Sequence, residues 1–215
     1  MSRGLLGCLV VGAFVLFIAV IAGMWFIGIR NHIVELDQAV AKQWSDVEND
    51  YQRRFDLIPN LVQTVQGAAN FEKSTLTEIT EARAKVGQVT MQGANIPNNP
   101  QAMQQYEQAQ AGLSSALSRL LVVVERYPEL RSNENFLQLQ SQLEGTENRI
   151  SVERRRFNDA AQTYNTYILK FPNSMVAGMS GFHTKEYFKG VTGSAEAPKV
   201  KFDFNPATSA PAASH

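Results

Sequence analysis

The chain has 215 residues, of which 44% are hydrophobic, and its 20 basic and 20 acidic residues give a formal net charge of zero. This balance, with no basic stripe interleaved with aromatic residues, predicts no nucleic-acid partner. The single cysteine, Cys8, excludes an intramolecular disulfide and a cysteine-based zinc cluster. The sequence contains no G-x-S-x-G motif, phosphate-binding loop or dinucleotide-binding glycine pattern. We therefore expect no enzyme activity, no cofactor, no metal site and no small-molecule substrate.

Residues 5–29 form an apolar run without a charged residue, preceded by a short tail at residues 1–4. At about 1.5 Å per residue such a helix exceeds the roughly 30 Å hydrocarbon core of a bilayer. Trp25 near the end of the run and Arg30 directly after it are typical of a membrane interface. The sequence thus predicts one transmembrane helix, with the lipid bilayer as a partner.

Two alternatives to a retained membrane helix stay open. Small residues at 20–22 have the spacing of a signal-peptidase site, although the apolar run continues past them and is long for a signal peptide. Residues 5–8 resemble a lipoprotein box, but no hydrophobic segment precedes them. The basic residues nearest the run are Arg3 before it and Arg30 and Lys42 after it, a difference too small to assign the side of the membrane.

Beyond residue 29 the pattern becomes amphipathic without a turn signal, so the membrane helix should continue into a helical domain over residues 30–190. Pro59 should kink this helix, because proline removes a backbone donor and its ring clashes with the preceding turn. A turn is expected near Gly67. Apolar residues recur at steps of three and four at Val40, Trp44, Val47, Tyr51, Phe55, Ile58, Val62, Val65 and Ala69.

The same periodicity predicts three further helices. The second has an apolar stripe over residues 76–89 and ends in a loop rich in glycine, asparagine and proline at 91–100. The third covers about 103–124 and stops before Pro128, and the fourth covers about 133–170. The heptad-like stripes are Met103, Tyr106, Gln110, Leu113, Leu117, Leu120 and Val124 in the third helix, and Phe136, Leu139, Leu143, Thr146, Ile150, Glu153, Phe157, Ala160, Tyr164, Tyr167 and Phe171 in the fourth.

Four long amphipathic helices joined by short or polar loops predict an all-α fold, an elongated antiparallel helical bundle that continues from the transmembrane helix. Phe182, Tyr187 and Phe188 should pack on this bundle, although glycine, serine and proline become more frequent after Pro172. Residues 191–215 form a C-terminal segment. We expect disorder after about residue 204, because the Pro/Ala/Ser-rich composition has little to bury.

Polar residues within the fourth helix are candidates for interaction sites. Thr146 and Glu153 occupy seam positions and are expected at a wet edge of the bundle; the alternative is a buried register or partner contact. Glu144 and Glu147 are expected to form a solvated or salt-bridged helix face, because no histidine completes the ligand pattern of a di-iron bundle.

Two other stretches are interpreted as structural. Arg54 and Asp56 are expected to form an ion pair near the kink. Residues 125–129 should form one end of the bundle; the alternative is a partner-binding tip. Pro59, Gly67, Pro128 and Gly145 are interpreted as residues that bend or end helices. The full set of candidate motif or interaction residues is Arg54, Asp56, Pro59, Asn60, Gly67, Glu125, Arg126, Tyr127, Pro128, Glu129, Glu144 and Glu147.

Several of these stretches resemble the bacterial LemA family. The matching pieces follow one another along the chain: RFDLIPNLVQTVQG at 54–67, EARA at 81–84, LLVVVERYPELRSNENF at 120–136 and LEGTENRI at 143–150, with Tyr164-Asn165, Phe171-Pro172 and Gly181-Phe182. The resemblance covers the chain to about residue 188. It implies a single-pass protein of the bacterial inner membrane with a long antiparallel helical bundle, without established catalytic residues, and associated with other envelope proteins.

The expected function is therefore that of a non-enzymatic, membrane-anchored envelope scaffold or adaptor, whose bundle binds another envelope protein or forms a homo-oligomer. Two alternatives remain. One is membrane remodelling by lateral assembly of many anchored bundles. The other is a carboxylate- and metal-dependent hydrolase that uses Glu144 and Glu147.

Overall fold

The computed structural model describes residues 3–67, 71–92 and 96–189, and these are helical with no strand among them. The predicted all-α fold is confirmed. The elements are α1 (Arg3–Gln66), α2 (Lys73–Gln92), η1 (Ile96–Asn98), α3 (Pro100–Val124), α4 (Pro128–Arg131), α5 (Glu134–Leu169) and α6 (Asn173–Ser180). The predicted C-terminal segment at 191–215 lies outside the described residues.

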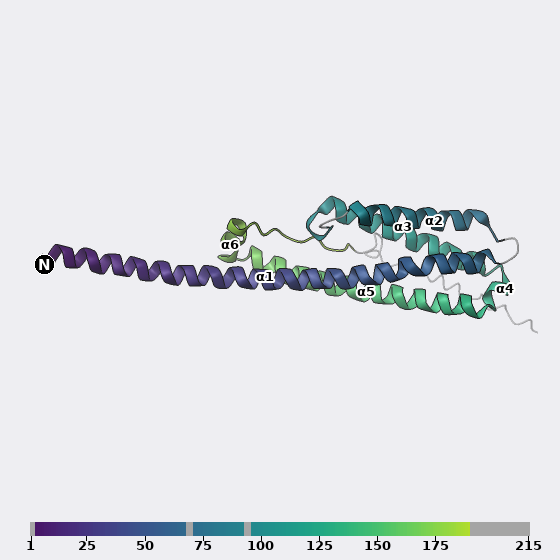
Figure 1. Ribbon diagram of the computed structural model, residues 1–215, viewed down its shortest axis with the longest axis horizontal. Helices are drawn as coiled ribbons and strands as arrows, with labels where there is room; N and C mark the ends of the chain where they lie inside the picture. The colour runs from purple at the N-terminus through teal and green to yellow at the C-terminus, as the bar shows by residue number, and fades with distance from the viewer. Residues whose placement is uncertain (1–2, 68–70, 93–95, 190–215) are drawn as a thin grey trace, which may run out of the picture.

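Helix α1 is 64 residues long and links the apolar run to the bundle without interruption. Its N-terminal part projects alone from the bundle (Figure 1), and the apolar side chains described between residues 10 and 27, apart from Phe26, are exposed. From Ile29 onward one stripe of α1 is buried. Among the described residues, α1 is the one helix long and apolar enough to cross a membrane, a criterion that a signal sequence also meets.

Two details of α1 differ from, or extend, what its sequence suggests. The helix begins at Arg3, inside the stretch expected to be a short tail, and it continues past Pro59 to Gln66. Gly67 follows as a turn residue, which places the end of α1 where the glycine predicts it. The kink at Pro59 stays a prediction.

The four long helices form two pairs. α1 packs along α5, and α2 packs along α3, as the two layers in Figure 1 show. α1 and α5 run antiparallel, because His32 packs edge-on against Tyr167 near one end of the pair and Arg54 contacts Glu147 nearer the other. α2 and α3 follow each other in the chain across a short connection, which favours antiparallel neighbours.

The core consists of two apolar clusters that follow each other along the bundle. The membrane-proximal cluster is built by α1, α5, α6 and the first turns of α3 around Trp44, whose ring lies 5.4 Å from Phe157 and 5.8 Å from Phe188. The distal cluster is built by the last turns of α1 with α2, α3 and the start of α5. Two separate clusters leave a boundary in the middle of the bundle, near Tyr51 and Ile58 of α1.

The predicted stripes are largely the buried faces, with corrections on α1 and α5. All seven predicted positions of α3 are buried. On α1, however, Phe55 and Val62 are only half-buried, and Arg54 and Leu61 take the buried positions. Ala69 of the first stripe lies outside the described residues. On α5, Leu139, Leu143, Ala160 and Tyr167 are only half-buried, and Ala161 and Ile168 are buried. At the end of the fourth stripe, Phe171 is 81% exposed, because α5 ends at Leu169 and the chain turns away.

Two short helices lie where the sequence predicted loops. The loop expected at 91–100 contains η1, whose Ile96 is buried, and residues 93–95 lie outside the described residues. The segment after Pro172 contains α6, which ends at Gly181 with a φ of 75°. Glycine favours this left-handed conformation because it has no Cβ to clash.

Residues 182–189 form an extended strap along α5, as expected for a segment packed on the bundle. Asn165 bonds both backbone groups of Lys185, at 2.8 Å to its N and 2.9 Å to its O. Asn158, two turns away, does the same for Phe188 at 2.9 and 3.0 Å. The two asparagines satisfy backbone groups that have no strand partner, so they fix the register of the strap on α5.

Candidate functional site

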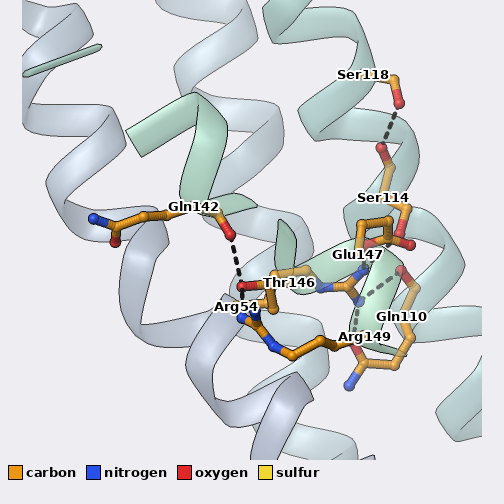
Figure 2. Close-up of polar contacts among 8 residues, drawn as sticks. All are labelled: Arg54, Gln110, Ser114, Ser118, Gln142, Thr146, Glu147 and Arg149. Atoms are coloured by element: carbon orange, nitrogen blue, oxygen red, sulfur yellow. Dashed lines mark hydrogen bonds and ion pairs between the residues drawn. The ribbon is translucent and has the colours of Figure 1, made fainter. Parts of the chain in front are cut away.

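A polar layer crosses the bundle between the two apolar clusters. Its members, which we call the Arg54 layer, come from three helices and are drawn in Figure 2. They are Arg54 of α1, Gln110 and Ser114 of α3, and Thr146, Glu147 and Arg149 of α5.

The guanidinium of Arg54 is the centre of this layer, and Arg54 is only 1% exposed. Its Nη1 donates to Ser114 Oγ and to Glu147 Oε2, both at 2.7 Å. Its Nη2 donates to Gln110 Oε1 at 2.5 Å and to the Gln110 carbonyl oxygen at 3.4 Å. Arg54 Nε has no hydrogen-bond partner among the described residues. One side chain of α1 thereby binds α3 and α5 at the same level.

A second polar connection joins α1 to α5 beside Arg54. Arg149 donates from Nε to Asp50 Oδ1 at 3.2 Å and from Nη2 to Thr146 Oγ1 at 2.9 Å. Thr146 Oγ1 in turn donates to the Gln142 carbonyl at 2.7 Å, as Figure 2 shows. Thr146 is fully buried, so the expectation of a wet edge was wrong at this position. The alternative of a buried register contact describes Thr146 better.

The tyrosines beside the layer are neutral phenols. The Tyr51 ring lies 5.0 Å from the Arg54 guanidinium carbon and 5.4 Å from the Tyr106 ring. Burial raises the pKa of the Tyr51 hydroxyl. Burial, with a smaller contribution from neighbouring Tyr51, also raises the pKa of Tyr106. Phenols with raised pKa values are not ionised near neutral pH, so both rings serve as packing, and the Tyr51 ring also offers a face to the Arg54 cation.

Two hollows are lined by both Arg54 and Glu147. One, of about 180 Å³, lies between α3 and α5 and is smaller than a typical small-molecule site. The other, of about 500 Å³, lies beside Glu107 and Arg154 and shares Arg54 and Glu147 with the first. Its charged side chains already contact one another, because Arg154 lies 3.4 Å from Glu107 and Arg54 lies 2.7 Å from Glu147.

The ion pair expected between Arg54 and Asp56 does not form. Residues two apart on a helix point to different sides, and Asp56 instead accepts from Gln52 Nε2 at 2.8 Å in solvent. Pro59 and Asn60 lie one to two turns further along α1; Asn60 is exposed and its carbonyl accepts from Thr64. The structure thus separates these three motif residues from the Arg54 layer.

The two candidate carboxylates of α5 have different surroundings. Glu147 is 55% exposed and pairs with Arg54, whereas Glu144 accepts from Gln140 Nε2 at 2.9 Å. Both are therefore on a paired helix face, as expected. Glu153, the other polar seam residue, contacts Arg156 at 2.7 Å. Within the described ranges, no group of three or more His, Cys, Asp or Glu side chains is placed to hold a metal ion.

Residues 125–129 form the distal corner of the bundle, at the α4 label in Figure 1. Pro128 begins α4, and the Tyr127 ring lies 5.0 Å from that of Phe71. Arg126 contacts Glu72 at 3.1 Å, and Glu125 contacts Arg131 at 3.3 Å. Glu129 is in the first turn of α4, where the helix dipole favours an acid. These contacts join the corner to Phe71 and Glu72, directly before α2, and to Arg131 of α4.

Sequence reasoning missed Gln110, Ser114 and Arg149 as members of the layer. Gln110 carried a usable signal, since it is the polar position in an otherwise apolar α3 stripe. Arg54 had the correct spacing too, three residues after Tyr51 and four before Ile58. Because arginine is charged, the sequence favours its apolar neighbour Phe55 for the buried position.

Comparison with known proteins places the chain in a family. The family model described as "LemA family" matches residues 43–202. The chain is 29% identical over 174 residues to magnetosome protein MamQ 2 of Paramagnetospirillum magneticum and over 173 residues to MamQ of Magnetospirillum gryphiswaldense. Each match covers 74% of this chain and 64% of the relative, so the chain spans less than two thirds of those proteins. Protein LemA of Metamycoplasma hominis is 23% identical over 167 residues, which are 76% of this chain and 72% of that protein. The family model matches well over half of the chain, and the chain therefore belongs to the LemA family.

Proposed function

We propose that the protein is a non-enzymatic, single-pass protein of the bacterial inner membrane, which acts as an envelope scaffold or adaptor through its helical bundle. The observation that carries the proposal is the continuity of α1 from an exposed apolar segment into the core of the bundle. At about 1.5 Å per residue, residues 29–66 extend roughly 55 Å beyond the apolar run. The bundle can thus present its distal corner far from the bilayer.

The chemistry of the Arg54 layer supports a scaffold. Arg54 contacts three side chains from two other helices. Such a layer fixes the register of α1, α3 and α5, a known use of buried polar groups in helical bundles. For the hydrolase alternative, Glu147 would have to give up its contact with Arg54.

The distal end offers a surface for a partner. Val122 in the last turn of α3 is 70% exposed, and Leu137 in the first turn of α5 is 49% exposed. Both lie near the corner formed by residues 125–129. Exposed apolar side chains beside charged ones are typical of interaction surfaces.

The test is crosslinking in native membranes, followed by purification and mass spectrometry. With the natural chain, we expect to recover a recurring partner or a defined homo-oligomer. With the double variant Val122→Asp/Leu137→Asp, we expect this partner or oligomer to be lost. Gln138→Asp, at an exposed site on α5, serves as the control and should keep the partner. Recovery of the natural chain always alone and monomeric would exclude a scaffold, and stoichiometric metal that is lost in Glu147→Ala would favour the hydrolase.

A further inference from the structure

The membrane-proximal end of the bundle carries apolar side chains that no described part of the chain covers. Leu169 is 66% exposed, Phe171 81%, Met175 61% and Met179 78%. We call these four residues the α6 surface. The stretch 171–184 around it contains no Asp, Glu, Lys or Arg. Several exposed apolar side chains close together in the chain, with Lys170 as the one charged residue within 169–184, are typical of an interaction site.

Helix α6 is apolar on both sides. Val176 and Ala177 are buried against the membrane-proximal cluster. Met175 and Met179, which are four residues apart and thus one above the other on the helix, face outward. Although Ser174 is also exposed, a helix with apolar residues on both its buried and its exposed side is suited to a position between protein and another apolar phase.

The position of α6 along α1 indicates that this apolar phase is the lipid bilayer. Val176 and Ala177 belong to the same cluster as Ile29 and Ile33, and Phe26 packs against this cluster from the end of the apolar run. In Figure 1, α6 lies beside α1 at the point where α1 leaves the bundle. Helix α6 therefore packs at the level of α1 where the uncharged run stops, one residue before Arg30.

The dimensions of a bilayer fit this position. The polar interface adds roughly 5 to 8 Å to each side of the hydrocarbon core, and Ile29 and Ile33 are about 6 Å apart along the helix axis. If α1 spans a bilayer as far as residues 25–29, α6 lies within the interfacial layer of the same leaflet. Arg30 and Lys170, both exposed, are at the same level and suited to lipid phosphates.

We propose that the α6 surface inserts into the interface of the bilayer that α1 spans, as a second and shallow membrane contact. The contact continues the exposed apolar surface of α1 at Met24, Trp25 and Ile27. It would hold the bundle at a fixed tilt, because a single helix leaves rotation and tilt open whereas two contacts do not. This inference rests on the proposed membrane anchorage.

The test places an environment-sensitive fluorophore on single cysteines of the full chain in vesicles of phosphatidylcholine with one fifth phosphatidylglycerol, in a Cys8→Ala background. The positions are Met179→Cys on the α6 surface, Ile18→Cys within the apolar run, and Val122→Cys at the distal end. Ile18 and Val122 are exposed like Met179. Lipids with a nitroxide near the headgroup end of the acyl chain quench labels at interfacial depth, as expected for Met179→Cys, and lipids with a nitroxide near the terminal methyl quench labels near the bilayer centre, as expected for Ile18→Cys.

We expect at least threefold stronger quenching at Met179→Cys than at Val122→Cys, together with quenching at Ile18→Cys. Quenching at Ile18→Cys without quenching at Met179→Cys would overturn the α6 contact and leave the anchor intact. Absence of quenching at Ile18→Cys would overturn the anchor and this inference with it. A Met179 label that is unquenched but shifts to shorter wavelength as the protein-to-lipid ratio rises would show a second copy on the α6 surface and so contradict lipid as its occupant.

Discussion

Arg54 Nη1 and Glu147 Oε2 are 2.7 Å apart although 93 positions separate the two residues in the chain. The contact joins α1 to α5 at the boundary between the two apolar clusters, and only the Glu147 end reaches solvent. A charge buried as completely as that of Arg54 is tolerated because its acceptors are in place. The integrity of the bundle therefore depends on this pair more than on any exposed ion pair.

The first prediction compares Glu147 with its neighbour. Glu147→Ala should lower the free energy of unfolding by about 2 kcal/mol, less than the 3–5 kcal/mol of a fully buried pair because Glu147 is half-exposed. Glu144→Ala should change it by less than about 0.5 kcal/mol, as exposed substitutions do. Urea unfolding of both variants in detergent, followed by circular dichroism, gives the two values. Equal decreases in the free energy of unfolding would show that the contact between Arg54 and Glu147 stabilises the protein no more than the exposed Glu144 does.

The second prediction concerns Gly145, which the sequence suggested as a helix-ending residue. It lies inside α5, and a Cβ there would meet its nearest atom at an ordinary 3.8 Å, at the Arg149 side chain. Gly145→Ala should stabilise the protein by about 0.5–1 kcal/mol, because alanine loses less backbone freedom in a helix. Gly181→Ala should destabilise it by a similar amount, since its φ is 75°. Thermal unfolding of the two variants should move the midpoint in opposite directions; a lower midpoint for Gly145→Ala would contradict the prediction.

The third prediction tests the strap along α5. Asn165→Leu removes both hydrogen bonds to Lys185 and leaves its backbone groups without those partners. Amide exchange at residues 182–189 should accelerate at least tenfold, while exchange in α2 stays unchanged. Asn148→Leu, at an exposed position of the same helix, is the control and should leave the strap protected. Unchanged exchange in Asn165→Leu would mean that the Asn158 hydrogen bonds and the packing of Phe188 hold the strap without Asn165.

The fourth prediction concerns alkaline pH. Burial, with a smaller contribution from Asp37, raises the pKa of Tyr164 from 10.0 to about 12. Because the folded state holds the proton more tightly than the unfolded state, this stabilisation is complete below pH 10 and is lost as the pH rises from 10 to 12. Two pKa units correspond to about 3 kcal/mol. The free energy of unfolding, measured at pH 9 and pH 12, should therefore fall less in Tyr164→Phe than in the natural chain, and an equal fall would contradict the assignment.

Much of the architecture was decided by local sequence. The uncharged run at 5–29, the steps of three and four along α3, Gly67 after α1 and Pro128 at the start of α4 all act within one or two turns. Such signals depend on backbone sterics and on which side of a helix is apolar, so they can be recognised without knowing the partners. This is why the helix order and the all-α fold were predictable.

The Arg54 layer and the α6 surface were decided only by the tertiary structure. Whether Arg54 is buried depends on Gln110, Ser114 and Glu147, which lie 56, 60 and 93 positions away. The position of α6 depends on its packing against α1 and α5, in a cluster that includes Ile29 and Ile33. A charged side chain can be buried, and an apolar one left exposed, once distant elements supply acceptors or leave a face uncovered. Sequence periodicity shows which face of each helix is apolar. The packing of the helices decides which neighbouring element that face contacts.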